Sequence, residues 1–192
     1  MWVGILTIME ELKVGQVIIS KQAEESANYK KFQQIVKKKK ISVLIVGAGA
    51  LYDPPKIQIE KDLYFEILWP DNSKLITENS LNNNSIVCKL HYNKFSMLFT
   101  GDIEEIAEKE ILKKYKNDLQ VFNSTILKVG HHGSKTSSTQ EFIEIVNPKI
   151  ALIGVGKNNK FGHPNDGVLE RLENLRYKNI PHRQNGRNNN NY

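Results

Sequence analysis

Side chains of metal-binding type follow three apolar stretches of the sequence, at the point where each stretch ends. Asp102 comes directly after the first stretch, within Thr-Gly-Asp, and His163 lies in a Gly-His-Pro loop after the third. Two adjacent histidines, His131 and His132, follow the second stretch. Loops at strand ends are where rigid scaffolds usually place catalytic groups. A carboxylate can bridge two cations, and neutral imidazole is a common donor to zinc-type and manganese-type ions, so these residues predict a hydrolytic metal site.

Each of these motifs also has a purely structural interpretation, in which its residues bind no metal and take no part in catalysis. The Gly-Asp pair could form a turn or cap the helix expected from Ile103, and one of the paired histidines could be buried against backbone. A lone Gly-His-Pro segment is a weak signal. The combination is more specific, because five glycines lie within or beside the strand exits and allow close backbone approach: Gly101, Gly130, Gly133, Gly154 and Gly162.

The composition is that of a globular protein with a core. Of the 192 residues, 40% are hydrophobic and 25% are charged, and the length suits one domain. The single cysteine, Cys88, excludes an intrachain disulfide, and no paired-cysteine spacing indicates structural zinc. No apolar run reaches the ~18 residues needed to cross a bilayer, so we predict no transmembrane segment in this chain.

The net charge of +6 favours a polyanionic substrate or partner such as nucleic acid. Four of the lysines, Lys37 to Lys40, lie together at the end of a predicted helix. Two interpretations of this run are open. It complements the helix dipole and is solvated, or it contacts phosphate groups.

The pattern of apolar residues predicts an α/β protein with an antiparallel central part. Helices are expected over residues 3–12, 24–40, 103–115, 139–146 and 165–177. Strands are expected over residues 17–19, 41–46, 56–60, 63–69, 86–92, 95–100, 125–129 and 149–155. A tight connection at Asn93 and Lys94 makes a hairpin of two of these strands. The hairpin argues against a doubly wound nucleotide-binding fold and favours a layered unit with helices on the sheet faces.

Three segments of the chain carry motifs that occur together in one family. They are residues 98–104 (LFTGDIE), 127–135 (LKVGHHGSK) and 154–164 (GVGKNNKFGHP). In this order and spacing they resemble the ComEC-type branch of the metallo-β-lactamase superfamily, the hydrolase domain of DNA-uptake competence proteins. The resemblance covers nearly the whole chain and is densest over residues 84–164. It implies an αββα sandwich, with mixed sheets covered by helices and a divalent-metal site at one edge.

The resemblance also implies roles for individual residues. Asp102 matches an acid that bridges metals, and His131 matches a histidine ligand. His132 and His163 match histidines in or beside the site, so the expected catalytic set is Asp102, His131 and His163. We rank His131 above His132 because neighbours in an extended segment point in opposite directions, although which of the two binds metal stays open. Further residues that could bind a phosphate, orient a histidine or stabilise their own loops are Ser134, Lys135, Asn158 and Asn159.

The resemblance departs from the family pattern at the start of the chain. Family members carry a His-x-(His or Asp)-x-Asp-His motif before a turn that corresponds to residues 3–6. Met1 and Trp2 stand where its last Asp and His should be. We therefore expect a partial domain over residues 1–184, incomplete at its N-terminal side, and a disordered Asn-rich tail over residues 185–192. Such a site should hold one zinc or manganese ion weakly, or none.

These expectations define two classes of function. The first is a metal-dependent hydrolase domain of phosphodiesterase or nuclease type, related to competence DNA uptake and impaired by the missing motif. The second is a non-catalytic remnant that binds nucleic acid or a protein partner. Full-length members are attached to a membrane channel. The resemblance therefore implies membrane association for a fragment of such a protein, and a cytoplasmic location for a stand-alone one.

Overall fold

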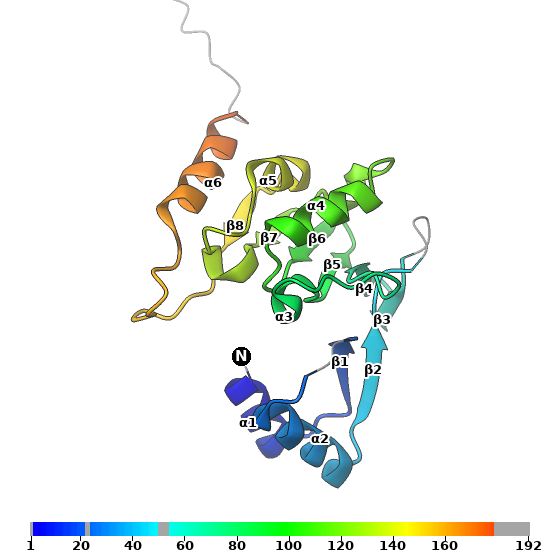
Figure 1. Cartoon of the computed structure of the whole chain (residues 1–192). Coiled ribbons are helices and arrows are strands. Elements are labelled where there is room, and N and C mark those ends of the chain that lie inside the picture. Colours follow the sequence, from blue (N-terminus) through cyan, green and yellow to red (C-terminus); the bar gives the residue numbers. More distant parts are fainter. Residues whose placement is uncertain (1, 22–23, 50–53, 179–192) are drawn as a thin grey trace, which may run out of the picture.

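The computed structural model describes residues 2–21, 24–49 and 54–178, which form two sheets with helices packed beside them (Figure 1). The smaller sheet pairs β1 with β2, and the larger has the strand order β3-β4-β5-β6-β7-β8. A separate cluster of buried apolar side chains belongs to each sheet. The mixed α/β class predicted from the sequence is confirmed.

The N-terminal part alternates helices with strands. Its elements are α1 (Trp2–Glu11), β1 (Gln16–Ser20), α2 (Ala27–Lys39) and β2 (Ser42–Val46). Ser26 caps α2, because its hydroxyl accepts a hydrogen bond of 3.1 Å from the Tyr29 backbone N–H. The helix ends at Lys40, which adopts a left-handed conformation. The buried side chains of this small core are Leu6, Met9, Phe32, Ile35 and Ile41.

The larger sheet is antiparallel through its first four strands and parallel through its last three. Its strands are β3 (Lys56–Glu60), β4 (Leu63–Trp69), β5 (Val87–Tyr92), β6 (Phe95–Phe99), β7 (Ile126–Lys128) and β8 (Ile150–Leu152). In the parallel part, Phe99 pairs with Lys128 and Lys128 pairs with Leu152. The C-terminal ends of β6, β7 and β8 therefore lie side by side at one edge of the sheet.

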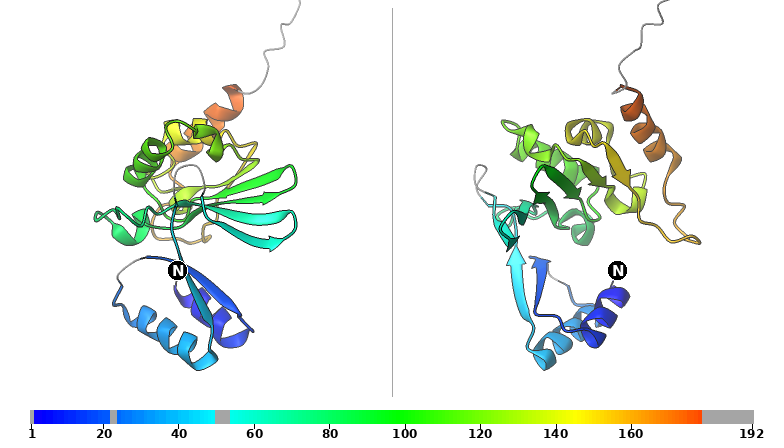
Figure 2. Two further views of the ribbon diagram at one scale, coloured as in Figure 1. Left: turned by 90° about the vertical axis from the view of Figure 1, so that its right-hand side faces the viewer. Right: turned by 180° about the vertical axis from the view of Figure 1, so that it is seen from behind.

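Helices cover the larger sheet and complete its core (Figure 2). They are α4 (Glu105–Lys114), α5 (Gln140–Val146) and α6 (Asp166–Lys178), with short connecting turns at α3 (Ser80–Asn83), η1 (Leu119–Phe122) and η2 (Gly130–Gly133). Tyr115 and Phe122 pack edge to face, with ring centroids 5.3 Å apart, and Phe142 of α5 lies beside Phe122. These aromatic rings fasten α4 and α5 to the same core.

All the predicted helices and strands are present, with shifts at their ends. The helix predicted from residue 24 begins at Ala27 because Ser26 caps it. The strand predicted over residues 149–155 is only Ile150–Leu152, which pairs residue for residue with the three residues of β7. The single turns α3, η1 and η2 have no periodic signal of their own. The tail over residues 185–192 lies outside the described residues, so the division at residue 184 stays a prediction.

An ion pair joins the end of β4 to the last turn of α4. Lys114 Nζ donates to Asp71 Oδ2 at 2.8 Å, and the hydroxyl and backbone N–H of Ser73 donate to Asp71 Oδ1. Burial raises the pKa of Asp71, but these hydrogen bonds outweigh it and lower the pKa to about 2. A carboxyl group with a lowered pKa stabilises the fold above its unfolded value of 3.8, and this contribution is lost as the pH falls through about 2.

We therefore expect Asp71→Asn to lower the free energy of unfolding at pH 7 by about 1 kcal/mol, a value reduced for solvent screening. The difference from wild type should shrink between pH 4 and pH 2. Urea unfolding at pH 7 and pH 3 measures both values. The matched control is Asp62→Asn, which makes the same charge change in the exposed turn between β3 and β4. An equal loss for both variants, or a loss from Asp71→Asn that does not vary with pH, would contradict the role assigned to the ion pair.

Candidate metal centre

Three loops carry the predicted site residues to the edge where the parallel strands end. Asp102 follows β6, His131 and His132 form the turn after β7, and His163 lies in the loop after β8. The carboxyl ends of parallel strands point toward the same edge of a sheet, so these residues become neighbours although 61 positions separate the first from the last. The three loops therefore meet at one edge, and the convergence of all these side chains on one ion stays a prediction.

Backbone hydrogen bonds join the three loops in pairs. The His131 backbone N–H donates to the Gly101 carbonyl at 3.0 Å, and the Asn165 N–H donates to the Gly133 carbonyl at 2.8 Å. Gly133 has a φ of +80°, and a Cβ at that position would lie 2.8 Å from Pro164 Cβ. Only glycine permits both this conformation and this approach of the second loop to the third.

The Asp102 side chain faces a histidine. It is 15% exposed, and its Oδ1 lies 3.7 Å from His132 Nε2. Gly101, with a φ of +56°, makes the turn that leads to it. The N-cap residue of α4 is Glu104, and its side chain makes no capping hydrogen bond. The alternative that Asp102 caps the helix therefore does not describe this structure, although the residue does lie in a turn.

The paired histidines form a tight turn, where the sequence analysis assumed an extended segment. His131 and His132 both have left-handed backbone conformations, with φ of 46° and 56°. Each such residue costs on the order of 1–3 kcal/mol, and this kind of strain is concentrated at functional sites. The premise that the two side chains alternate across a strand was wrong, because consecutive left-handed residues coil the chain instead of extending it.

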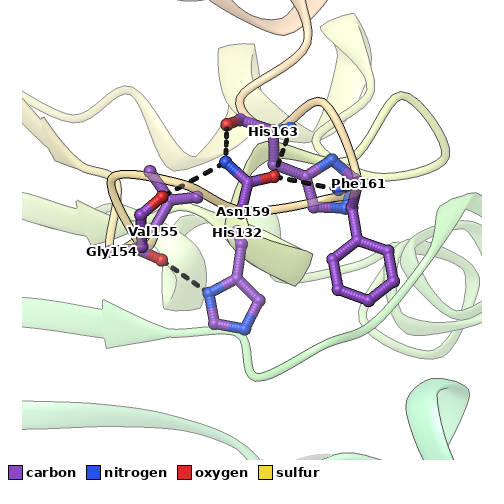
Figure 3. Close-up of a pocket in the computed structure, with 7 residues that line it drawn as sticks. His132, Gly154, Val155, Asn159, Phe161 and His163 are labelled. Atoms are coloured by element: carbon purple, nitrogen blue, oxygen red, sulfur yellow. Dashed lines mark hydrogen bonds between the residues drawn. The ribbon is translucent and has the colours of Figure 1, made fainter.

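Both histidines consequently lie at the candidate site, in different surroundings. The ring of His131 lies 5.8 Å from the ring of His163, measured between centroids. His132 Nδ1 lies 2.5 Å from the Gly154 carbonyl oxygen (Figure 3). A carbonyl oxygen only accepts hydrogen bonds, so Nδ1 is protonated, and Nε2 is the ring nitrogen that faces Asp102. This arrangement is typical of metal-binding histidines, whose second nitrogen is fixed by a backbone carbonyl.

A buried carboxylate stands behind His131. Glu104 is 9% exposed, and its oxygens accept hydrogen bonds from Asn79 at 2.9 Å, Asn83 at 3.4 Å and Thr136 at 3.1 Å. Its Oε1 also lies 3.4 Å from His131 Nδ1. The orientation at this distance is not that of a hydrogen bond, and His131 Nδ1 is a buried polar atom without a hydrogen-bond partner in the described part of the chain. A small rotation of the imidazole would let it donate to Glu104.

The third loop forms a pocket with a volume of about 360 Å³ beside His132. Its lining residues are His132, Gly154, Val155, Gly156, Asn159, Phe161 and His163. Figure 3 shows the rings of His132 and Phe161 on the same side of the loop segment that contains Asn159. Partial burial lowers the pKa of His163 below its ordinary value, and the neighbouring imidazoles of His131 and His132 lower it further. A lowered pKa favours the neutral imidazole that binds metals.

The four residues predicted to contact substrate differ in what they touch. The hydroxyl of Ser134 is bonded to Thr136 within its own loop, and the amide of Asn159 is bonded to backbone atoms of the loop that carries His163. The loop-stabilising alternative describes these contacts. Lys135 and Asn158 are exposed beside the site. Phosphate binding by any of the four stays a prediction.

Comparison with known proteins identifies the family of this fold. The family model described as "Metallo-beta-lactamase superfamily" matches residues 3–157, which is most of the chain. The chain belongs to the metallo-β-lactamase superfamily. Members of this superfamily usually bind divalent metals, which agrees with the carboxylate and imidazole donors at the edge of β6, β7 and β8.

Several relatives of this metallo-β-lactamase domain have names connected with competence. The chain is 32% identical over 166 residues to ComE operon protein 3 of Bacillus subtilis (strain 168). This match covers 86% of this chain and 20% of that protein. It is 34% identical over 108 residues to Competence protein ComA of Neisseria gonorrhoeae, covering 56% of this chain and 15% of the relative. Recombination protein 2 of Haemophilus influenzae is 37% identical to the chain over 121 residues, a match that covers 60% of this chain and 13% of that protein. The similarity is consistent with a ComEC-type domain.

This metallo-β-lactamase domain spans a fifth or less of the length of those relatives. Among the residues that the structure describes, none of the helices is long and apolar enough to pass through a bilayer.

The donors at the site fit a divalent ion in chemical type, and one pair fits in spacing. Two ligands of a tetrahedral zinc ion, each at 2.0–2.1 Å, lie roughly 3.3 Å apart. His132 Nε2 and Asp102 Oδ1, at 3.7 Å, are close to that separation. Within residues 2–21, 24–49 and 54–178, however, no three or more His, Cys, Asp or Glu side chains are grouped so as to hold an ion. A third ligand therefore requires side-chain movement or comes from outside the described residues.

The sequence analysis did not assign Glu104, Asn79 or Asn83 to the site. Glu104 carries one signal that could have identified it, since it follows Asp102 within the LFTGDIE motif. Its position near a helix start gave it an ordinary explanation as an acid that favours the helix dipole. Asn79 and Asn83 have no comparable signal, because their contacts with Glu104 join segments more than 20 residues apart.

Proposed function

We propose that this chain is a metal-dependent hydrolase domain of phosphodiesterase or nuclease type, acting on nucleic acid in competence-related DNA uptake. The observation that carries the proposal is the 3.7 Å approach of Asp102 to His132 after β6 and β7, with His163 of the next loop lining the same pocket as His132. Carboxylate and imidazole at that edge suit a zinc or manganese ion. The net charge of +6 suits a polyanionic substrate, and the names of the relatives are consistent with DNA.

The proposal gives each side chain at the edge a separate task. Asp102 and His132 bind the ion as a pair, and His163 is the third ligand after a rotation of its side chain. His131 has Glu104 3.4 Å from its Nδ1, and a small rotation of the imidazole would let Glu104 orient it. When bound, the ion polarises a phosphoryl oxygen and lowers the pKa of a water molecule. With so few ligands in place, we expect a single weakly held ion.

Lys128 places a positive charge beside this carboxylate. Burial lowers the pKa of Lys128 and the charge of Asp102 raises it. Its Nζ donates to the Val129 carbonyl at 2.9 Å, which holds the ammonium group at the end of β7. A cation in this position attracts a phosphate group toward the candidate site.

A second candidate function is a domain that binds nucleic acid without cleaving it. The observation in its favour is that the described residues do not form a group of three metal ligands. The loops that follow β6, β7 and β8 would then serve as a surface that binds nucleic acid.

Nuclease assays on the purified 192-residue chain test the proposal. With end-labelled single-stranded DNA and Mn²⁺ or Zn²⁺, we expect slow cleavage, below the ~1 s⁻¹ at the lower end of typical enzyme turnover. A chelator should abolish the cleavage, and His132→Ala should lower it at least about 100-fold. The control His91→Ala removes an imidazole from β5, where it is bonded to Glu66 at 3.0 Å away from the candidate site.

The outcomes of this assay separate the two candidate functions. DNA binding without cleavage in either metal would contradict hydrolysis and support the binding domain. Cleavage that persists in chelator, or that His132→Ala does not change, would contradict the assigned site.

A further inference from the structure

Phe161 is unusual for a large apolar residue because it projects into water next to the candidate site. Its side chain is 81% exposed, more than any other large hydrophobic residue that the structure describes. It also lines the pocket together with His132 and His163 (Figure 3). A single exposed apolar residue on a protein surface needs no explanation, but one that lines a candidate active site does.

The exposure of Phe161 is built into its loop. The side-chain oxygen of Asn159 accepts hydrogen bonds from the backbone N–H groups of Phe161 at 3.2 Å and His163 at 3.0 Å. The side-chain nitrogen of Asn159 donates to the His163 carbonyl at 2.7 Å and to the Gly156 carbonyl at 3.3 Å. One amide thus spans the loop and fixes the position from which the Phe161 side chain leaves it.

The ring of Phe161 lies nearly parallel to the imidazole of His163. Their planes differ by 20°, and their centroids are 5.9 Å apart. The imidazole is therefore beside one face of the phenyl ring, and the high exposure leaves the opposite side accessible to solvent. An exposed flat apolar surface of this size matches a flat apolar ligand better than it matches a phosphate or a sugar.

Positive charges flank this ring along the chain. Lys157 and Lys160 are exposed, and neither has an ion-pair partner among the residues described. In the sequence Lys-Asn-Asn-Lys-Phe, one of these lysines directly precedes the aromatic residue and the other lies four positions before it. Binding sites for single-stranded nucleic acid combine the same two features, because bases stack on the aromatic ring while cations bind the phosphates.

We propose that Phe161 is a stacking platform for an unpaired nucleobase, with Lys157 and Lys160 binding the adjacent phosphates. The inference rests on the proposed function, since it takes the substrate to be nucleic acid, and it narrows that substrate to single strands. The faces of bases inside a duplex are covered by their neighbours, so an internal base pair offers nothing to the ring. The stacked base would lie across the phenyl ring from His163, and its adjacent phosphodiester would lie toward the metal-binding edge.

Binding measurements in EDTA, where metal-dependent cleavage is blocked, test this inference. The probes are a single-stranded oligonucleotide containing 2-aminopurine, its duplex, and an abasic strand of the same length. Wild type should quench the 2-aminopurine fluorescence and bind the single strand most tightly. Phe161→Leu should weaken single-strand binding about 5- to 150-fold and remove the quenching, because stacking contributes about 1–3 kcal/mol per base. Phe161→Trp should preserve both.

Tyr92→Leu is the matched control, since Tyr92 is 51% exposed and lies at the end of β5, next to the hairpin turn. It should bind the single strand as wild type does. If wild type binds and Phe161→Leu binds equally well with the same quenching, the stacking inference fails while the proposed substrate stands. If Phe161→Leu weakens binding to the abasic strand as much as to the intact strand, stacking on a base is contradicted. If wild type binds none of the probes, the proposed substrate itself fails.

Discussion

Replacing Asp102 by asparagine should lower the affinity of the chain for Zn²⁺ or Mn²⁺ at least about 100-fold, because removing even a residue that only orients a ligand costs 10–100-fold. The Asp102 carboxylate lies 3.7 Å from Nε2 of His132, its proposed partner in binding the ion. The amide retains the size of the carboxylate but loses the negative charge that offsets the charge of the ion. Isothermal titration calorimetry measures the change directly.

The fold should survive this substitution, since the Asp102 side chain makes no structural ion pair other than its contact with His132 in the described chain. Asp62→Asn is the matched control because it makes the same change of charge at the exposed β3–β4 turn. Equal affinities for wild type, Asp102→Asn and Asp62→Asn would show that any bound ion lies elsewhere.

Glu108→Ala should lower the free energy of unfolding by about 3 kcal/mol, a larger loss than that expected for Asp71→Asn. The Glu108 side chain is 1% exposed, and its two oxygens accept hydrogen bonds from the backbone N–H groups of Ser138 at 2.5 Å and Thr139 at 2.8 Å. Alanine would leave both N–H groups without these acceptors, the one of Ser138 buried and the one of Thr139 half-buried. The Arg171 guanidinium, which donates to the Ser138 carbonyl at 2.9 Å, would also lose a nearby negative charge.

Thermal unfolding followed by circular dichroism measures this loss, with an expected fall in Tm of about 6–12 °C for a chain of this length. Glu108→Gln should lose less, since its amide oxygen still accepts one of the two hydrogen bonds. Glu105→Ala serves as control, because Glu105 is exposed at the start of the same helix and forms an exposed ion pair with Lys109. A Tm for Glu108→Ala as high as that of Glu105→Ala would show that these N–H groups find other acceptors.

The sequence predicts the strand exits well, because period-two alternation, turn residues and helix caps are local signals. The parallel pairing of β6, β7 and β8, with Phe99 beside Lys128 and Lys128 beside Leu152, fits the helices predicted between these strands, because parallel neighbours need a crossover connection. The geometry of the histidine pair does not follow. Two consecutive left-handed residues other than glycine are intrinsically unfavourable, so tertiary contacts must hold them there.

Long-range contacts also explain why the surroundings of the site were missed. The Gly154 carbonyl fixes His132 across 22 positions of sequence, and Asn79 reaches Glu104 across 25. Neither contact can be predicted from a pattern in the local sequence, because its partners are far apart in the chain. The same is true of Phe161, whose exposure depends on how Asn159 braces the loop.

Histidine side-chain NMR during a titration with Zn²⁺ tests the central claim, that one ion binds where β6, β7 and β8 end. Long-range proton–nitrogen spectra report the tautomer and metal binding of each imidazole separately. We expect His132 and His163 to shift together at Nε2 or Nδ1, with His131 responding beside them. His91, bonded to Glu66 on β5, should stay unchanged. Shifts at His91 alone, or no coordinated response of His132 and His163 at saturating zinc, would contradict a metal site at this edge.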